Sequence, residues 1–175
     1  MSATLYLAQE VGAGLGKCPL LQRRLPPWQN RPKVMTTLLI IHLAITWALV
    51  GLIWTIQVVH YPLLKSVGHE GFIDYHDRHM SRVTWVVGPL MLAEVGSAGL
   101  LLFLGERSLL FGISLGALAL VWASTAFWQV PLHHKLMHGY DAAIIDRLVR
   151  TNGWRTFGWT VRGLCLVGLI ILKLH

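Results

Sequence analysis

Charged residues are scarce in this sequence: Asp, Glu, Lys and Arg make up 13% of its 175 residues, whereas 54% are hydrophobic. A soluble domain carries about 25% charged residues, so this composition predicts an integral membrane protein. Cysteine is also scarce, because only Cys18 and Cys165 occur, which excludes a disulfide framework and a CxxC pair. The sequence likewise lacks a phosphate-binding loop, a Ser-His-Asp arrangement and a dinucleotide fingerprint.

Acidic residues are few, and the 15 Lys and Arg leave a net charge of +7. These basic residues lie mostly between long apolar runs, where they set membrane topology and contact anionic lipid, so we expect no nucleic-acid partner. Many of the eight Trp stand near the ends of those runs, as in the aromatic belt at a membrane interface. Charge and aromatic residues therefore both favour a multi-pass membrane protein, and a bacterial inner membrane is the expected location.

Residues 1–34 differ from the rest because they are rich in Gly, Pro and basic residues. They lack the ordered basic, apolar and small-residue regions of a signal peptide. We interpret them as a flexible basic tail in front of a transmembrane domain, residues 35–175. An alternative interpretation is that Met35 is the true start of the protein.

Four apolar runs follow, and a membrane-spanning helix needs about 20 such residues. Since backbone polar groups in a bilayer must satisfy one another, each run is predicted to be a helix. The second and third runs are joined only by residues 105–108, which forces an antiparallel hairpin. The predicted fold is an all-α, integral membrane, up-down four-helix bundle. Its helices are expected at about residues 37–59, 84–104, 109–130 and 157–174.

This topology places two polar, His-rich connections, residues 60–83 and 131–156, on one membrane face with seven of the nine His. Counted from Met35, the basic residues make that face cytoplasmic, whereas with the full tail the two faces carry equal numbers. Small residues in the second and third runs offer surfaces for close contact between helices. They are Gly96 and Gly99, and Gly112 and Gly116.

The polar segment Phe72–Arg82 carries the first histidine pair. His76 and His79 are three residues apart, so on a helix they share one face, which we expect to point toward the bundle. Imidazole binds iron, copper, zinc or nickel, and Asp74 or Asp77 can orient the ring from behind. The alternative is a solvated amphipathic connection without a metal.

A second histidine pair follows the third apolar run. His134 and His138 have the i, i+4 spacing of a helical chelating pair, but no Glu lies between them, so this is not a zinc-protease motif. With His60, the two pairs are predicted to hold iron, copper or a haem at the mouth of the bundle. The predicted metal ligands are therefore His60, His76, His79, His134 and His138.

Two charged residues, Glu94 and Arg162, lie inside apolar runs. A charge at the centre of a bilayer costs about 2.5–3.5 kcal/mol on insertion scales, so each should face the interior and find a partner. We predict either a Glu94–Arg162 pair that fixes helix register or a catalytic role, with Glu94 as metal ligand or proton acceptor. Gln57 and Gln129 are expected to line the same cavity. Arg155 either contacts lipid phosphate or holds an anionic or quinone-like substrate.

Several features, taken in order along the chain, resemble a known group of proteins. They are Tyr61-Pro62-Leu63, Phe72, Tyr75-His76, Asn152, Trp154, Arg155 and Arg162. They resemble those of small four-helix bacterial membrane proteins akin to the anthrone-oxygenase-like domain, over about residues 37–172. The resemblance implies an oxygen-using oxidation of an aromatic or lipophilic compound without a cofactor. The abundance of His departs from that pattern and favours a metal.

One principal hypothesis and two alternatives follow. The principal hypothesis is a metal- or haem-dependent membrane oxidoreductase that acts on a lipophilic or quinone-like substrate. The first alternative is a non-enzymatic subunit or assembly factor of a larger membrane complex, and the second is a small transporter that uses Glu94 and Arg162. Glycine-bearing helix faces favour a homo-oligomer or a larger complex. The sequence leaves open whether the protein is an enzyme.

Overall fold

The computed structural model of the chain describes residues 31–174. Its contacts divide the chain into two units, Met1–Val34 and Met35–His175. The predicted tail, residues 1–34, lies almost entirely outside the described residues, and the second unit carries the fold. Short turns join its helices, and no strand occurs between residues 31 and 174.

Four helical segments account for nearly all of this unit, and each is long and apolar enough to cross a membrane. The prediction of an all-helical chain with four such segments is therefore confirmed. The first segment comprises α2 (Arg31–Thr55), a π-helical turn (Ile56–His60), α3 (Tyr61–Leu64) and a 3-10 turn (Lys65–Val67). The second is α4 (Phe72–Phe103). The third comprises α5 (Leu109–Ser124), a second π-helical turn (Thr125–Gln129) and α6 (Val130–Leu136), and the fourth is α7 (Ala142–Leu174).

The helices are longer than their apolar runs, and the prediction of two long connections is wrong. α4 begins at Phe72 rather than near residue 84, and α7 begins at Ala142 rather than near residue 157. Only residues 68–71 and 137–141 remain as links on the His-rich side. The reason is that polar residues continue the helices as amphipathic turns, with part of their side chains facing inward. At 1.5 Å per residue the 32-residue α4 is roughly 48 Å long, which exceeds a hydrocarbon core of about 30 Å.

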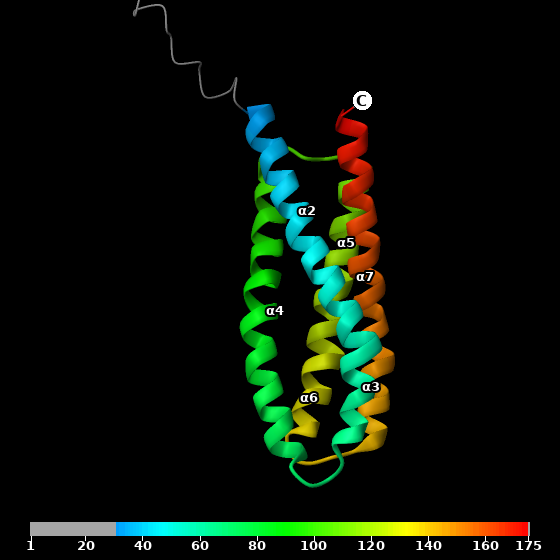
Figure 1. Ribbon diagram of the computed structural model, residues 1–175. Coiled ribbons are helices and arrows are strands. Elements are labelled where there is room, and N and C mark those ends of the chain that lie inside the picture. The colour runs from blue at the N-terminus through cyan, green and yellow to red at the C-terminus, as the bar shows by residue number, and fades with distance from the viewer. Residues whose placement is uncertain (1–30, 175) are drawn as a thin grey trace, which may run out of the picture. The chain divides into compact units, whose positions relative to one another are not determined.

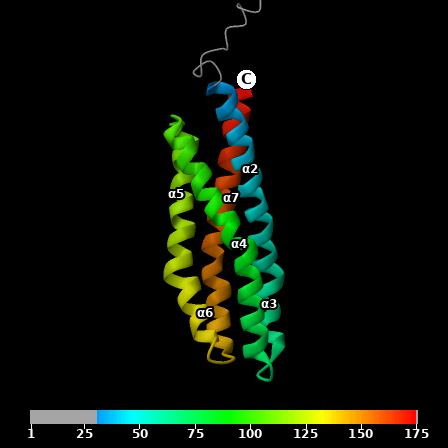
Figure 2. The ribbon, with the colours of Figure 1, turned by 90° about the vertical axis from the view of Figure 1, so that its left-hand side faces the viewer.

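The turn 68–71, α6 and the start of α7 lie at the same end of this unit (Figure 1). Residues of α2 and α4 pair in opposite numerical order: His42 contacts Ser97, and Thr46 contacts Glu94. Figure 2 shows α4 crossing the bundle obliquely, from beside α5 at one end to beside α3 at the other. α4 therefore borders both α2–α3 and α5–α6.

α5 and α7 make the closest helix–helix contact of the bundle, and a glycine permits it. A Cβ at Gly158 would lie 2.7 Å from Val121 Cγ2 and 3.3 Å from the carbonyl oxygen of Ala117, both on α5. The glycines singled out in the sequence behave differently, because nothing lies within 4 Å of a Cβ built at Gly96, Gly99, Gly112 or Gly116. Within residues 31–174 these four glycines are exposed and bring no two helices of this bundle together. A role in contacts between copies of the chain stays a prediction.

Two apolar clusters pack inside the bundle, with a polar layer between them. One contains Leu49 and Trp159, and the other contains Leu39 and Leu166. Along α2 and α7, the residues between these apolar positions include buried polar and charged side chains. A polar layer thus separates the two apolar clusters where α2 and α7 pass the middle of the bundle.

Two short links before α4 and α7 contain residues suited to starting a helix. Gly71, just before α4, has a φ of 73°, a left-handed conformation that a glycine adopts without strain. Asp141, just before α7, accepts hydrogen bonds at Oδ1 from the backbone N–H groups of Ala143 (2.8 Å) and Ile144 (3.0 Å). These contacts fix where α4 and α7 begin, and so fix which residues of both helices face the interior.

Candidate functional site

Polar side chains gather in two places inside the bundle. We call the first the histidine cluster, which comprises His60, Tyr61, His76, His79 and His133 at the end near the turn 68–71. We call the second the central network, which comprises His42, Thr46, Glu94, Ser97, Trp159 and Arg162. Polar groups inside apolar helices destabilise the fold unless they are hydrogen-bonded, so each contact in these groups matters.

A chain of three hydrogen-bonded side chains forms the core of the histidine cluster. The Tyr61 hydroxyl lies 2.9 Å from Nε2 of His133, and Nδ1 of His133 lies 3.1 Å from Nε2 of His76. All three side chains are buried. His133 therefore links a residue of α3 to a residue of α4 through both of its ring nitrogens.

This chain admits two proton arrangements, assigned from its hydrogen bonds. In the first, Tyr61 donates to His133, which donates from Nδ1 to His76. In the second, His76 donates to His133, which donates from Nε2 to Tyr61, and the Tyr61 hydroxyl donates to Oε1 of Gln129 at 3.4 Å. Moving from the first arrangement to the second requires one proton to enter at Tyr61 and another to leave from Nδ1 of His76, which is buried without a hydrogen-bond partner. The chain therefore connects Tyr61 to His76 through hydrogen bonds that either direction of donation satisfies.

The two π-helical turns place these residues. Each turn begins six residues before a proline, Pro62 in the first segment and Pro131 in the third. A proline ring lacks an N–H and crowds the preceding turn, and the wider π turn accommodates it. The extra residue rotates the helix that follows, so that Tyr61 and His133 face inward.

His60 and His79 form a separate stacked pair. Their ring centroids lie 3.9 Å apart with an interplanar angle of 21°, and the Tyr75 ring lies 6.5 Å from His60 on the same side of the bundle. Nε2 of His60 is buried and has no hydrogen-bond partner. The pair lies next to the hydrogen-bonded chain but is not hydrogen-bonded to it.

A ladder of amides connects the first segment to α7 and ends at Arg155. Gln57 donates from Nε2 to the backbone oxygen of Val149 (3.2 Å) and accepts at Oε1 from Asn152 Nδ2 (2.8 Å). Asn152 in turn accepts at Oδ1 from Arg155 Nη1 (3.2 Å). The Arg155 guanidinium also lies 5.1 Å from the centre of the Trp159 ring, a cation–π contact. The ladder fixes the position of Arg155.

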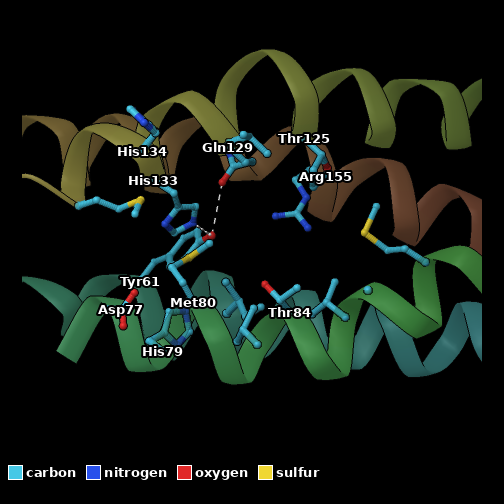
Figure 3. A pocket seen from close by; sticks show the side chains of 17 residues that line it. Tyr61, Asp77, His79, Met80, Thr84, Thr125, Gln129, His133, His134 and Arg155 are labelled. Carbon is cyan, nitrogen blue, oxygen red and sulfur yellow. Dashed lines mark hydrogen bonds between the residues drawn. The ribbon is translucent and has the colours of Figure 1, made fainter. Parts of the chain in front are cut away.

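A cavity of about 390 Å³ lies between α4 and the α5–α6 segment (Figure 3). One part of its wall is apolar and includes Ile56, Val83, Val87 and Met91. Its polar lining comprises Tyr61, Asp77, His79, Thr84, Thr125, Gln129, His133, His134 and Arg155. Exposed lining residues such as Thr84 and Val130 bring the cavity to the surface of the bundle.

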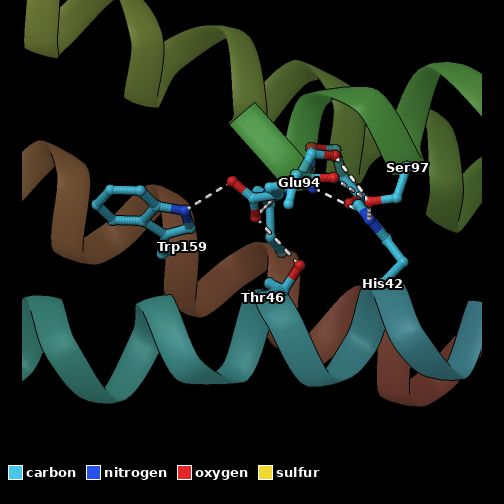
Figure 4. A network of polar contacts seen from close by, with 8 residues as sticks. His42, Thr46, Glu94, Ser97 and Trp159 are labelled. Atoms are coloured by element: carbon cyan, nitrogen blue, oxygen red, sulfur yellow. Dashed lines mark hydrogen bonds and ion pairs between the residues drawn. The ribbon is translucent and has the colours of Figure 1, made fainter. Parts of the chain in front are cut away.

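The central network is built around Glu94, which is completely buried (Figure 4). Its Oε1 accepts hydrogen bonds from Thr46 Oγ1 (3.1 Å) and Arg162 Nε (2.9 Å), and its Oε2 accepts from Trp159 Nε1 (3.0 Å). Arg162 also donates from Nη1 to the backbone oxygen of Ser114 (2.7 Å). The network thus connects all four helical segments.

Arg162 also fixes the tautomer of His42. Nη2 of Arg162 lies 3.1 Å from Nε2 of His42, and because a guanidinium only donates, that nitrogen accepts. Nδ1 of His42 therefore carries the proton and donates to Ser97 Oγ at 2.7 Å. The Ser97 hydroxyl in turn donates a hydrogen bond to the backbone oxygen of Ala93 (2.6 Å). Every polar group on this path has a partner, which is the pattern of a structural network.

The structure brings together some of the residues expected from the sequence. The expected ion pair between Glu94 and Arg162 is present, while the predicted catalytic role of both residues stays a prediction. Gln129 and Arg155 line the cavity, and Gln57 holds Arg155 through Asn152 without lining it. Sequence reasoning missed His133 and the burial of His42. The signal for His133 was Pro131, which follows the polar end of the third apolar run. The signal for His42 was its i, i+4 spacing from Thr46, which places both residues on one face of α2.

The predicted pairing of His76 and His79 with His134 and His138 is replaced by another. His133 contacts His76, whereas His134 and His138 are exposed and contact each other, with ring centroids 5.4 Å apart. His134 still borders the cavity opposite His79, and His138 does not. Within residues 31–174, no group of three or more His, Cys, Asp or Glu side chains is arranged to hold a metal ion. The five predicted ligands are therefore not gathered into one group in this structure, and metal binding by any of them stays a prediction.

Comparison of the chain with protein-family models, with curated proteins and with solved structures gives no match. The resemblance to the anthrone-oxygenase-like domain accordingly stays a prediction. The cavity, the histidine cluster and the two buried arginines of α7 are the features of this chain that point to a function.

Proposed function

We propose that this chain is a multi-pass membrane protein, an up-down bundle of four spans, whose cavity binds a lipophilic small molecule with a polar, quinone-like head. The cavity carries this proposal, because it combines an apolar wall with converging polar groups inside helices apolar enough to span a bilayer. Its volume of about 390 Å³ lies within the range of about 300–1,000 Å³ that is usual for small-molecule sites.

The two parts of the lining suit the two parts of such a ligand. Val83, Val87 and Met91 offer the apolar contact that a hydrocarbon body needs. Arg155 and Gln129 offer hydrogen bonds to the oxygens of its head. Because lining residues are exposed on the side of the bundle, the ligand would enter from the membrane rather than from water.

The histidine cluster supplies the chemistry in this proposal. A ligand head next to Tyr61 or His133 can exchange a proton with the Tyr61–His133–His76 chain, which then rearranges its hydrogen bonds. Proton exchange of this kind accompanies the oxidation and reduction of quinones and phenols, so the oxidoreductase hypothesis extends this proposal. A metal or haem in that reaction stays a prediction, which the metal content and the visible spectrum of the purified protein would test.

Cavity-filling substitutions test the binding proposal. Gly88 lines the cavity, and nothing lies within 4 Å of a Cβ built there, so Gly88→Leu extends a side chain without an initial clash. Gly96 lies on the same helix, is equally open and does not line the cavity, so Gly96→Leu is the matched control. We expect Gly88→Leu to weaken binding of a decyl-substituted benzoquinone at least tenfold, and Gly96→Leu to leave it unchanged. Equal binding by both variants would contradict the proposal.

A further inference from the structure

Two buried arginines on α7 differ in whether a carboxylate pairs with them. Arg162 is completely buried and forms an ion pair with Glu94 at 2.9 Å. Arg155, two helical turns earlier, is 6% exposed and forms no ion pair with any carboxylate of residues 31–174. The polar groups around Arg155 include Asn152, the Trp159 ring, the Tyr61 hydroxyl and His133, and none of them is a carboxylate.

A buried guanidinium without an anion is costly, because it has lost most of its hydration without gaining a counter-charge. Arg155 also keeps an unused donor, since its Nε is buried and has no hydrogen-bond partner. The missing anion and the unused Nε–H are not caused by a loosely held side chain, because Gln57 and Asn152 hold Arg155 in place. The side chain borders the cavity and lies between α4 and the α5–α6 segment in Figure 3. What Arg155 lacks is therefore an anion, and the space beside it is the cavity.

We propose that the head group of the ligand is an anion, with oxygen atoms that accept hydrogen bonds from the Nε edge of Arg155. This proposal rests on the function proposed above and specifies its ligand class: a lipophilic body that carries a carboxylate, phenolate or phosphate oxygen. A guanidinium presents its N–H groups as a planar fork, which matches two oxygens of a carboxylate or phosphate. The Tyr61 hydroxyl lies next to the same guanidinium.

The charged residues that line the cavity favour a ligand whose anionic head lies at Arg155. Asp77, the one carboxylate among the lining residues, is exposed and lies next to His79, at the opposite end of the lining from Arg155 in Figure 3. An anionic head is therefore attracted to Arg155 and repelled from the Asp77 end. The apolar side chains of Val87 and Met91 line the part of the cavity that would take the body of the ligand.

The test compares an acid with a neutral analogue of the same length. Dodecanoic acid, dodecan-1-ol and methyl dodecanoate are titrated against the purified full chain in a non-ionic detergent at pH 8, where a carboxyl group is ionised. Charge-assisted hydrogen bonds are the stronger ones, so we expect the acid to bind roughly 10- to 100-fold more tightly than the alcohol or the ester. Arg155→Gln should reduce the affinity for the acid to that for the alcohol, and Arg155→Lys should retain part of the preference.

A competition experiment distinguishes the two sources of such an anion. If phosphatidylglycerol displaces radiolabelled dodecanoic acid from the wild type, and Arg155→Gln abolishes this displacement, the natural anion is a phospholipid head group. If only the free acid binds through Arg155, the natural ligand is a lipophilic acid or phenolate. Either result supports the proposal, because both assign an anion to Arg155.

Two results would overturn it, and they are distinguishable. Equal affinity of the wild type for acid, alcohol and ester, with all three weakened by Gly88→Leu, would refute the anionic head while leaving the proposed cavity function intact. Failure of all three and of the benzoquinone to bind would refute both. Folding is monitored independently through the thermal unfolding of Arg155→Gln, which we expect to match the wild type because the substitution removes an unpaired charge.

Discussion

Removal of the Glu94 carboxylate should strongly destabilise the bundle. In a Glu94→Leu variant, Arg162 stays buried without its counter-charge, and the indole N–H of Trp159 loses its acceptor. Breaking a buried ion pair from one side costs about 3–5 kcal/mol, and each orphaned buried polar group adds about 1–3 kcal/mol. We therefore expect the free energy of unfolding to fall by about 4 kcal/mol or more. The double variant Glu94→Leu with Arg162→Met should recover most of this loss, because it removes both charges.

The assay is reversible unfolding of the purified protein in mixed micelles, followed by circular dichroism, with the single and double variants combined into a double-mutant cycle. Lys65→Met is the matched control, because it breaks an ion pair with Asp146 that is about half exposed. Such surface pairs contribute roughly 0–1 kcal/mol, so this variant should unfold almost like the wild type. The reasoning is refuted if Glu94→Leu costs less than about 1 kcal/mol, or if the double variant is no more stable than the single one.

Two further predictions concern the ends and the packing of the helices. Burial alone would raise the pKa of Glu106, but its contacts with Lys173 (2.7 Å) and with the backbone N–H of Ser108 (3.1 Å) outweigh this and lower the pKa. The stabilisation is present above about pH 4.5 and is lost as the pH falls through the lowered value, so the melting temperature of the wild type should fall more steeply below pH 4.5 than that of Lys173→Met. Gly158→Ala should destabilise the protein by about 1–3 kcal/mol, because its Cβ would lie 2.7 Å from Val121 on α5, whereas Gly153→Ala, which meets nothing within 4 Å, should not. Thermal unfolding of both glycine variants tests this, and equal losses would contradict the packing account.

Much of the architecture was predictable because it depends on composition along the chain. Runs of about 20 apolar residues specify helices whatever their neighbours are. The Glu94–Arg162 pair was predictable for a related reason: a charge inside an apolar run is so costly that the few available opposite charges become its expected partners.

The detail of the site was not predictable from the same patterns. The i, i+4 spacing favoured His134 and His138 over His133, whereas the π-helical turn before Pro131 decides that His133 faces inward. One additional residue in a turn rotates every side chain that follows, and no periodicity in the sequence reports it. The extension of α4 to Phe72 was missed for another reason. The apolar run alone begins near residue 84, and the polar residues before it were expected in a connection that holds at most a short helix. The expected inward orientation of His76 is confirmed, because His76 is completely buried and hydrogen-bonded to His133.

The sequence separates Arg162, which lies in an apolar run with Glu94 as its expected partner, from Arg155, for which it leaves lipid phosphate and an anionic or quinone-like substrate open. It does not show that Arg155 is buried without a carboxylate partner. Only the three-dimensional positions show that one faces Glu94 and the other faces a cavity. A charge that the chain leaves unpaired is informative because the rest of the interior pairs its charges.

The most direct test of the cavity function is to map where a membrane-soluble ligand lies. The full chain in lipid nanodiscs is labelled with a diazirine-bearing analogue of dodecanoic acid, irradiated and digested, and the adducts are located by peptide mass spectrometry. We expect adducts on cavity-lining residues of α4 and of the link after α6, such as Met80, Met91 and Met137, and their loss in Gly88→Leu. Adducts confined to exposed residues outside the cavity, such as Leu92 and Phe103, and unchanged in Gly88→Leu, would contradict it.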